Sequence, residues 1–282
     1  SVWLMAQFST PTHVGVAETF IALGVIYFCF MSVGSIIVRI PAPGWKPEGW
    51  TAPAQPKKLV TANNVYVYEA LKTPQFWLIW WVLCLNVTAG IGVLGQASAM
   101  IQEIFPGKVT VIAASGFVGL MSLFNMGGRY CWATLSDYIG RKTTYAVFFI
   151  LGTVLYILVP QAGAAGSTAA FVICFLIIIS MYGGGFSTVP AYLRDMFGTR
   201  YVGAIHGLLL TAWSMAGIFG PVLVNYIRQY NVTHGVAKAQ AYNTTMYVMA
   251  VLLVIGFFCN LAVRAVNKRH HMTAQQEAQA AA

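Results

Sequence analysis

An anion could be bound by the side chains of three residues that are suitably spaced, Asn125, Arg129 and Trp132. Asn125 and Trp132 lie at positions i−4 and i+3 from Arg129, so on a helix the three side chains share one face. The planar guanidinium of arginine can donate two parallel hydrogen bonds to a carboxylate. The alternative is that Arg129 extends to a helix end or pairs with Asp137. The sequence pattern leaves both interpretations open.

A second stretch carries a group that could exchange a proton. His206 falls on the same helix face as Leu210 and Trp213, and histidine titrates near neutral pH. The alternative, which we favour for this residue, is a hydrogen-bonded histidine near a helix end. His206 is therefore a candidate for proton coupling and no more than that.

The chain shows no pattern for metal, cofactor or covalent chemistry. Its five cysteines all lie inside apolar runs, without a CxxC pair and without a histidine at metal-ligand spacing, so they are predicted to be small apolar side chains. No nucleophile, base and orienting group converge in the sequence. We expect neither an enzyme nor a bound cofactor or metal.

The elements that position these residues must be helices that cross a lipid bilayer. Of the 282 residues, 58% are hydrophobic and 8% are charged, whereas soluble domains carry roughly 25% charged residues. A helix needs about 20 apolar residues to span a bilayer. The uncharged runs predict an all-α polytopic membrane protein with seven transmembrane helices, at about 14–38, 76–101, 110–134, 143–161, 168–192, 202–227 and 243–264.

Prolines and glycines predict where two of these helices are interrupted. The apolar run from Thr143 to Leu193 is long enough for two helices, and Pro160 with the small residues of 163–167 is predicted to separate them. Gly183, Gly184 and Gly185 are predicted to interrupt the following helix, either for close packing or as a hinge.

The basic residues indicate an orientation. Twelve of the sixteen Lys and Arg residues fall in one alternating set of loops, three fall in the other set, and the last is Arg129. Because Lys and Arg are retained on the cytoplasmic side, we expect the amino end outside and the carboxyl end inside, in a cell (inner) membrane. The net charge of +9 would suggest nucleic acid on a soluble chain, but sorted by loop it indicates orientation, and no nucleic-acid partner is expected.

The same pattern predicts four parts. An outer segment with the first helix covers 1–39, a cytoplasmic connector 40–75, a six-helix bundle 76–266 and a cytoplasmic tail 267–282. The connector is rich in proline and is predicted to be mostly extended, with a short interfacial helix within 63–71 as an alternative. The polar tail is expected to be disordered from Met272 onwards.

The segment from Ala133 to Lys142 predicts a tight turn between two transmembrane helices. Asp137 can cap backbone N–H groups or pair with a basic neighbour, Gly140 permits a sharp reversal, and Arg141 and Lys142 hold the turn at the cytoplasmic surface. This turn resembles the signature that joins the second and third helices of each half of a major facilitator superfamily transporter. Ala133 and Tyr138 stand where that signature has a glycine and a basic residue.

Further segments resemble the oxalate:formate antiporter family of that superfamily, and the resemblance covers nearly the whole chain. They are 39–50, 71–77, 86–90 and 190–198, followed by Gly203-Ala-Ile-His-Gly207. The chain is similar to the sixth through twelfth helices of a twelve-helix transporter, which implies that the amino-terminal helices of the full transporter are absent here. Asp195 and Arg200 bracket the turn within this resemblance and are expected to pair.

The resemblance implies roles for several residues. Arg129 matches an arginine of the eighth helix that is implicated in binding the dicarboxylate in the family. Independently of the resemblance, Gln96, Asn86 and Asn125 are polar side chains at bilayer depth and are expected to line a cavity. The family's oxalate carrier has a lysine in its eleventh helix, and here Trp213 stands at or beside that position. One cationic site suits a monocarboxylate such as formate or pyruvate better than oxalate.

These observations predict a secondary transporter of small carboxylates that works by anion exchange or proton symport with alternating access. A channel or a carboxylate sensor that keeps the transporter fold is the alternative of a different class. A further alternative is that the chain is inactive without the missing helices.

Overall fold

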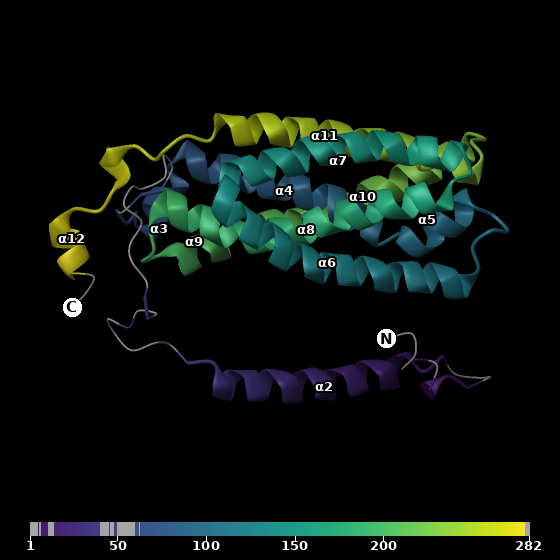
Figure 1. Ribbon diagram of the computed structural model, residues 1–282, viewed down its shortest axis with the longest axis horizontal. Helices are drawn as coiled ribbons and strands as arrows, with labels where there is room; N and C mark the ends of the chain where they lie inside the picture. Colours follow the sequence, from purple (N-terminus) through teal and green to yellow (C-terminus); the bar gives the residue numbers. More distant parts are fainter. Residues whose placement is uncertain are drawn as a thin grey trace. The chain divides into compact units, whose positions relative to one another are not determined.

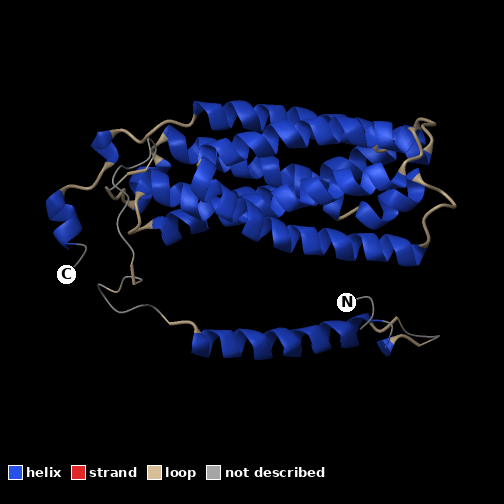
Figure 2. Ribbon diagram, in the orientation of Figure 1, coloured by secondary structure: helices blue, strands red, loops and turns tan. Residues whose placement is uncertain are grey.

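The computed structural model describes residues 5, 7–10, 14–39, 45, 48–49, 60–61 and 63–279. These residues form helices and no β-strand (Figures 1 and 2). The chain divides into two compact units, Ser1–Gln55 and Pro56–Ala282. Half of the predicted connector, including the prolines of 41–56, lies outside the described residues.

The first unit contains one long helix, α2 (Val16–Ile37), which is apolar enough to cross a membrane and carries Glu18 in its first turn. Thr19 is its one buried residue, and the Thr19 hydroxyl donates to the carbonyl oxygen of Gly15 at 2.6 Å. That bond lets a polar side chain fit an apolar helix, because a backbone carbonyl satisfies the hydroxyl.

The second unit is a helical bundle (Figure 1). Its long helices are α4 (Pro74–Leu94), α6 (Val111–Ile139), α7 (Arg141–Ala164), α8 (Thr168–Phe197), α10 (Thr211–Thr233) and α11 (Asn243–Ala262). The shorter ones are α3 (Val67–Leu71), α5 (Ala97–Ile104), α9 (Val202–Leu209), η1 (Lys238–Gln240), η2 (Lys268–His270) and α12 (Ala274–Gln279). The principal packing pairs are α6 with α8, α4 with α10, and α11 with both α7 and α4.

Local sequence explains where these helices begin and end. The side chains of Thr73, Thr110 and Ser167 accept hydrogen bonds from backbone N–H groups in the first turns of α4, α6 and α8, as Ser and Thr do at helix starts. Gly140 and Gly198 end α6 and α8 with φ of 88° and 84°. Positive φ strains residues that carry a Cβ, so glycine fits both turns.

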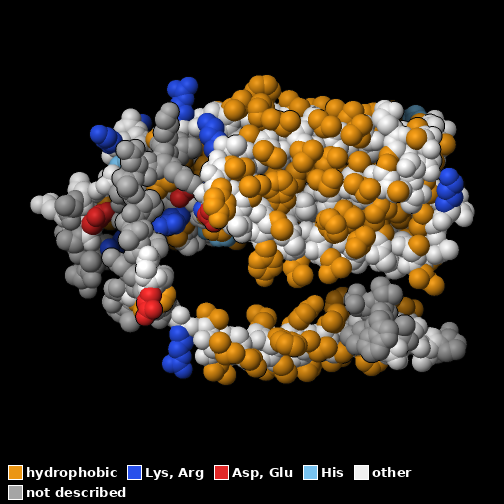
Figure 3. Space-filling view, viewed as in Figure 1, with side chains coloured by type: hydrophobic (Ala, Val, Ile, Leu, Met, Phe, Trp, Pro, Cys, Tyr) orange, Lys and Arg blue, Asp and Glu red, His pale blue; other side chains and the backbone are white. Residues whose placement is uncertain are grey.

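Hydrophobic side chains cover the long sides of the bundle, while charged side chains collect at its ends (Figure 3). We call the end that carries Lys72, Arg141, Arg194, Arg200 and Arg264 the basic end, and the end that carries Lys108 and Lys238 the far end. Among the described residues, seven segments are long and apolar enough to cross a membrane. The predicted number of spans is confirmed.

The predicted separation of the run 143–193 into two helices is confirmed within 163–167, whereas two other spans are divided where no break was predicted. Pro160 lies inside α7, and the chain leaves that helix at 165–167, where Gly166 has a φ of 64°. Conversely, the predicted helix at 76–101 is divided into α4 and α5 around Gly95 and Gln96, and the predicted helix at 202–227 is divided into α9 and α10 at Leu210. A proline within a packed helix costs one backbone hydrogen bond, which the surrounding helices can compensate.

The three consecutive glycines do not interrupt a helix, because α8 runs unbroken from Thr168 to Phe197. The tail also departs from the prediction, since it continues as an ordered chain to Gln279. It is held by a hydrogen bond from the Met272 N–H to the Asn64 carbonyl oxygen (2.8 Å) and by one from Asn64 Nδ2 to Glu277 Oε1 (2.9 Å).

Candidate functional site

Arg129 and Asn125 lie on one face of α6, and Phe186 of α8 lies beside them. The Arg129 Nε donates to Asn125 Oδ1 at 3.3 Å, which is the i−4 contact that the spacing predicts. Arg129 Cζ lies 5.5 Å from the centroid of the Phe186 ring, within the range of a cation–π interaction. The partners described for this exposed guanidinium are a neutral amide and an aromatic ring, so it can still pair with an anion.

Arg129 lies well inside its span. It precedes Ile139, the last residue of α6, by ten residues, which corresponds to about 15 Å of helix. The hydrocarbon core of a bilayer is about 30 Å thick. Arginine at such a depth is costly, and it usually faces protein or an aqueous path.

An aromatic cluster adjoins the guanidinium. The rings of Phe186 and Trp213 make an edge-to-face contact with centroids 5.5 Å apart, and Tyr182 lies 5.2 Å from Phe186 on the next turn of α8. Trp213, near the start of α10, is 45% exposed. Arg129, Phe186 and Trp213 therefore bring one cation and two large rings together from α6, α8 and α10.

Close packing of α6 against α8 fixes this arrangement. A Cβ added to Gly183 would overlap the backbone oxygen of Asn125, and one added to Gly128 would overlap that of Ser180. The Ser187 hydroxyl donates to the carbonyl oxygen of Arg129 at 2.9 Å. Glycine at these crossings lets the two backbones touch, as small residues do between membrane helices.

The third residue of the predicted anion-binding face belongs to the packing instead. Trp132 Nε1 donates to Ser180 Oγ at 3.2 Å, and its ring meets Phe148 edge to face with centroids 5.0 Å apart. A Cβ on Gly184 would also overlap Trp132. Its indole N–H is already satisfied between α6 and α8, so Trp132 supports the site from the side.

Gln96 and His206 are placed on other parts of the bundle. Gln96 immediately precedes α5, beyond the far end of α4, which puts it about 30 Å along that helix from Thr73. Since Arg129 lies about half that distance from the basic end, the two residues are at different depths. His206 is half-buried on α9, which ends at Leu209, whereas Trp213 lies on the next helix, α10.

The turn from α6 to α7 forms an ion-pair cluster at the basic end. Arg141 pairs with Asp137, and its Nε lies 3.7 Å from Asp195 Oδ2. Lys142 Nζ donates to the carbonyl oxygens of Leu261 and Val263, both at 2.7 Å. These bonds tie the turn to the ends of α8 and α11.

The ion pair described for Asp195 therefore differs from the expected pair with Arg200. The backbone N–H of Arg200 donates to Asn64 Oδ1 at 3.1 Å, and its Cζ lies 6.0 Å from the Tyr201 ring centroid. Arg141, at 14% side-chain exposure, is better placed than a loop residue to meet the partly buried Asp195.

Comparison with known proteins identifies the family. Residues 2–221 match the Major Facilitator Superfamily. The chain belongs to the Major Facilitator Superfamily.

Two characterised relatives narrow the comparison. The chain is 29% identical over 243 residues to the "Oxalate:formate antiporter" of Oxalobacter formigenes, which covers 86% of this chain and 53% of the relative. It is 23% identical over 292 residues to the "Apicoplast pyruvate carrier 1" of Toxoplasma gondii, which covers 93% of this chain and 50% of the relative. The chain thus spans about half the length of the curated relatives it matches.

Membership of the superfamily confirms the expected class. Both relatives are transporters and not enzymes. The seven apolar segments together with this membership make the chain a multi-pass membrane protein with part of the major facilitator fold.

Sequence reasoning missed two features of this superfamily member. Phe186 lies beside the guanidinium of Arg129, and the Ser187 hydroxyl donates to the Arg129 backbone oxygen. Neither residue type indicates by itself a role at an anion site. A signal was present: Tyr182 and Phe186 are four residues apart and flank three glycines, a pattern that places two rings on one face beside a close helix contact.

Proposed function

We propose that this chain forms part of a secondary transporter that carries small carboxylates by alternating access. The observation that carries the proposal is the exposed Arg129 guanidinium, which lies deep in a span against the neutral Asn125 amide and the Phe186 ring. A carboxylate is the simplest partner for it, because the arginine fork matches two carboxylate oxygens. Both relatives are named for carboxylate transport, one as an oxalate:formate antiporter and the other as a pyruvate carrier, and this supports the same substrate class here.

Within that class, a monocarboxylate such as formate or pyruvate is the proposed substrate. The cluster described around Arg129 contains aromatic side chains from α8 and α10 and no second cation among its described members. One positive charge neutralises a monoanion and leaves half of a dianion such as oxalate unpaired, which is unfavourable in a low-dielectric site.

We also propose an orientation in the membrane and two modes of coupling. The basic end is proposed to face the cytoplasm of a cell (inner) membrane, because it carries most of the Lys and Arg residues. Anion exchange and proton symport both fit the site. In the symport version His206, on the helix that precedes α10, is the proton-coupling residue.

The test uses the full-length protein in proteoliposomes and measures uptake of radiolabelled formate, pyruvate and oxalate. Arg129→Gln should reduce uptake at least about 30-fold, since truncating one partner of a desolvated charge pair costs about 2–5 kcal/mol. Arg264→Gln, which removes an exposed positive charge at the basic end, is the matched control and should stay near wild type.

The kinetics separate the mechanisms. Saturable uptake that internal substrate stimulates supports exchange, and uptake that a proton gradient drives and His206→Gln abolishes supports symport. Flux that does not saturate would indicate a channel. Normal transport by Arg129→Gln would contradict the role of the guanidinium.

A further inference from the structure

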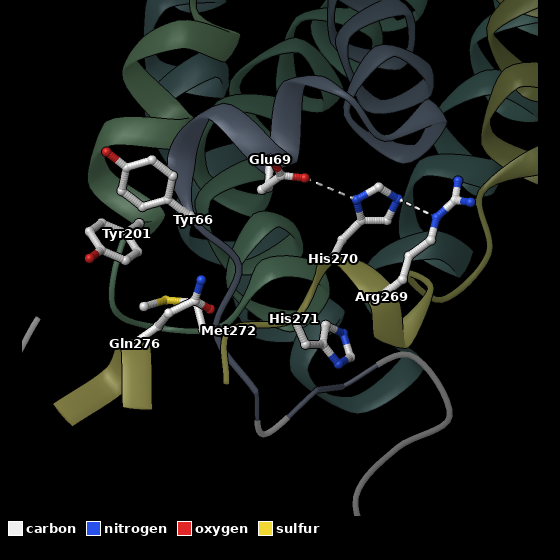
Figure 4. Close-up of a pocket in the computed structure, with 8 residues that line it drawn as sticks. All are labelled: Tyr66, Glu69, Tyr201, Arg269, His270, His271, Met272 and Gln276. Atoms are coloured by element: carbon white, nitrogen blue, oxygen red, sulfur yellow. Dashed lines mark hydrogen bonds and ion pairs between the residues drawn. The ribbon is translucent and has the colours of Figure 1, made fainter. Parts of the chain in front are cut away.

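A cavity lies at the basic end, away from Arg129. It has a volume of about 660 Å³ and is lined by three segments that are distant in sequence (Figure 4). Tyr66 and Glu69 come from α3 and the residue before it, Tyr201 from the turn between α8 and α9, and the rest from the tail, chiefly Arg269, His270 and His271.

Backbone hydrogen bonds hold the three segments together. The Val65 N–H donates to the Phe197 carbonyl oxygen at 3.0 Å, which joins the chain before α3 to the end of α8. Asn64 bonds both other segments, because its Oδ1 accepts from the Arg200 N–H at 3.1 Å and its carbonyl oxygen accepts from the Met272 N–H at 2.8 Å. The walls of the cavity are thus joined by backbone hydrogen bonds and by the Asn64 side chain.

The acidic side chain in the cavity wall is already neutralised. Glu69 forms an ion pair with Lys72, and its Oε2 lies 3.3 Å from His270 Nδ1. The hydrogen bonds from Lys72 and His270 lower the pKa of Glu69 from its ordinary value. Glu69 therefore stays ionised and paired, and it contributes little unbalanced negative charge to the cavity.

The neighbouring basic side chains supply hydrogen-bond donors. Arg269 Nε donates to His270 Nε2 at 3.0 Å (Figure 4), so the proton of His270 is on Nδ1, toward Glu69. Partners for Arg269 are described at Nε only, which leaves its terminal amino groups able to bind a ligand. The guanidinium of Arg269 keeps its full positive charge.

His271 adds a buried donor. Its Nδ1 lies 3.3 Å from the Asn63 amide nitrogen, which can only donate, so Nδ1 accepts and the proton is on Nε2. Nε2 is buried and has no hydrogen-bond partner among the described residues. A buried N–H group without an acceptor is unfavourable, so an acceptor that reached Nε2 would be stabilising.

We propose that this cavity binds a phosphate-bearing anion. Phosphate offers several acceptor oxygens for the Arg269 and His271 donors of the tail, and it is a preferred partner of arginine. The volume exceeds what a small carboxylate needs, and the Tyr66 and Tyr201 rings, edge to face at 5.4 Å, form an aromatic wall of the kind found at membrane interfaces. The phosphate comes from a lipid headgroup or from a free anion. This inference does not depend on the proposed transport.

The test measures binding to the full chain in nanodiscs. In discs of neutral phosphatidylcholine, inorganic pyrophosphate is titrated by calorimetry. In a second arm without pyrophosphate, the discs contain phosphatidylglycerol, and protection of 268–279 from hydrogen exchange is compared with that in neutral discs. A response to pyrophosphate assigns a free anion, and protection by phosphatidylglycerol assigns a lipid.

Paired variants separate the cavity from diffuse charge. Arg269→Gln should weaken the affinity for pyrophosphate, or the protection by phosphatidylglycerol, at least about tenfold. This is the effect of one lost charge-assisted hydrogen bond. Arg264→Gln, an equal change of charge outside the cavity wall, should change it less than about twofold. Equal losses in the two variants, or no response in either arm, would overturn the proposal. Because Arg269 is exposed, unchanged thermal midpoints of both variants confirm that the fold is intact.

Discussion

At the scale of single residues, the environment of Arg129 matters most. Its guanidinium lies in a span, where an isolated charge is unfavourable, and its described contacts are a 3.3 Å hydrogen bond to Asn125 and the face of Phe186. Neither contact neutralises the charge. The position of Arg129 within a span followed from the sequence, but Phe186 did not, because its role depends on how two helices cross.

Trp213→Lys should shift substrate preference toward dianions. The new ammonium would lie near the Phe186 ring and supply a second positive charge to the site. We expect uptake of oxalate relative to formate to rise about tenfold, the factor that corresponds to 1.4 kcal/mol of added pairing. Competition between the two labelled substrates in proteoliposomes measures the ratio.

The control for that substitution is Trp213→Leu, which removes the indole without adding charge. It should leave the preference for formate in place. An equal gain of oxalate uptake in both variants would mean that space, and not charge, sets the selectivity.

Docking of the tail should weaken as pH falls through the ordinary range of histidine. Burial lowers the pKa of His271 below its ordinary value of 6.5, and the nearby charges of His270 and Lys268 lower it further. The acidic groups of the adjoining elements, Glu69 and Glu277, hydrogen-bond His270 and Asn64 instead.

The sign of the effect follows from proton linkage. The free tail binds a proton at His271 more readily than the docked tail, so docking is fully stable above about pH 6.5 and is lost progressively below it. A spin label at Gln275 should become more mobile between about pH 7.5 and 5.5. His271→Gln should remove that dependence, whereas His234→Gln, at the far end, should retain it. Label mobility that is constant with pH in the wild type would contradict the expectation.

At the scale of elements, glycine determines how α6 and α8 pack. The sequence predicts that Gly183, Gly184 and Gly185 interrupt their helix, either for close packing or as a hinge. In the structure α8 is continuous, and its glycines contact α6 and Asn86 of α4. Likewise, the breaks at Gln96 and Leu210 carry no proline, so local sequence did not reveal them. Packing between distant segments decides these features.

Gly183→Ala should destabilise the bundle and reduce transport. The added Cβ would overlap the Asn125 backbone oxygen and also approach the side chain that orients Arg129. Overpacking of this kind costs about 1–3 kcal/mol. The thermal midpoint in detergent, together with uptake of formate, checks both effects.

Gly119→Ala on α6 is the matched control. Nothing lies within 4 Å of a Cβ at that position, and alanine favours a helix over glycine by about 0.8–1.0 kcal/mol. Gly119→Ala should therefore be neutral or slightly stabilising. A loss of stability as large as that of Gly183→Ala would show that the close contact is not the cause.

At the scale of the whole molecule, the sequence predicted the number of spans well. Long uncharged runs leave few ways to place seven helices, and the alternation of basic loops constrains them further. The ends were predicted less well. The tail is ordered by contacts with Asn63 and Asn64, two hundred residues away in sequence, which composition does not reveal.

Labelling should place the two ends of the bundle on opposite sides of the membrane. Arg264→Cys at the basic end and Lys238→Cys at the far end are introduced in a cysteine-free background, since Cys29 and Cys131 are exposed. In intact cells a membrane-impermeant maleimide should label Lys238→Cys and spare Arg264→Cys until the membrane is opened. Labelling of both from outside would contradict the seven-span topology.

The glycine contacts between α6 and α8 also have an entropic consequence. They fix Asn125, the Arg129 backbone and Phe186 in one arrangement when the protein folds, so little conformational freedom remains to be lost when an anion arrives. Ordering of side chains opposes binding by about 0.5–1.5 kcal/mol for each long side chain. If Arg129 binds the proposed carboxylate, a preorganised pair of cation and ring avoids part of that loss and helps a single arginine to hold a ligand that offers few atoms for contact.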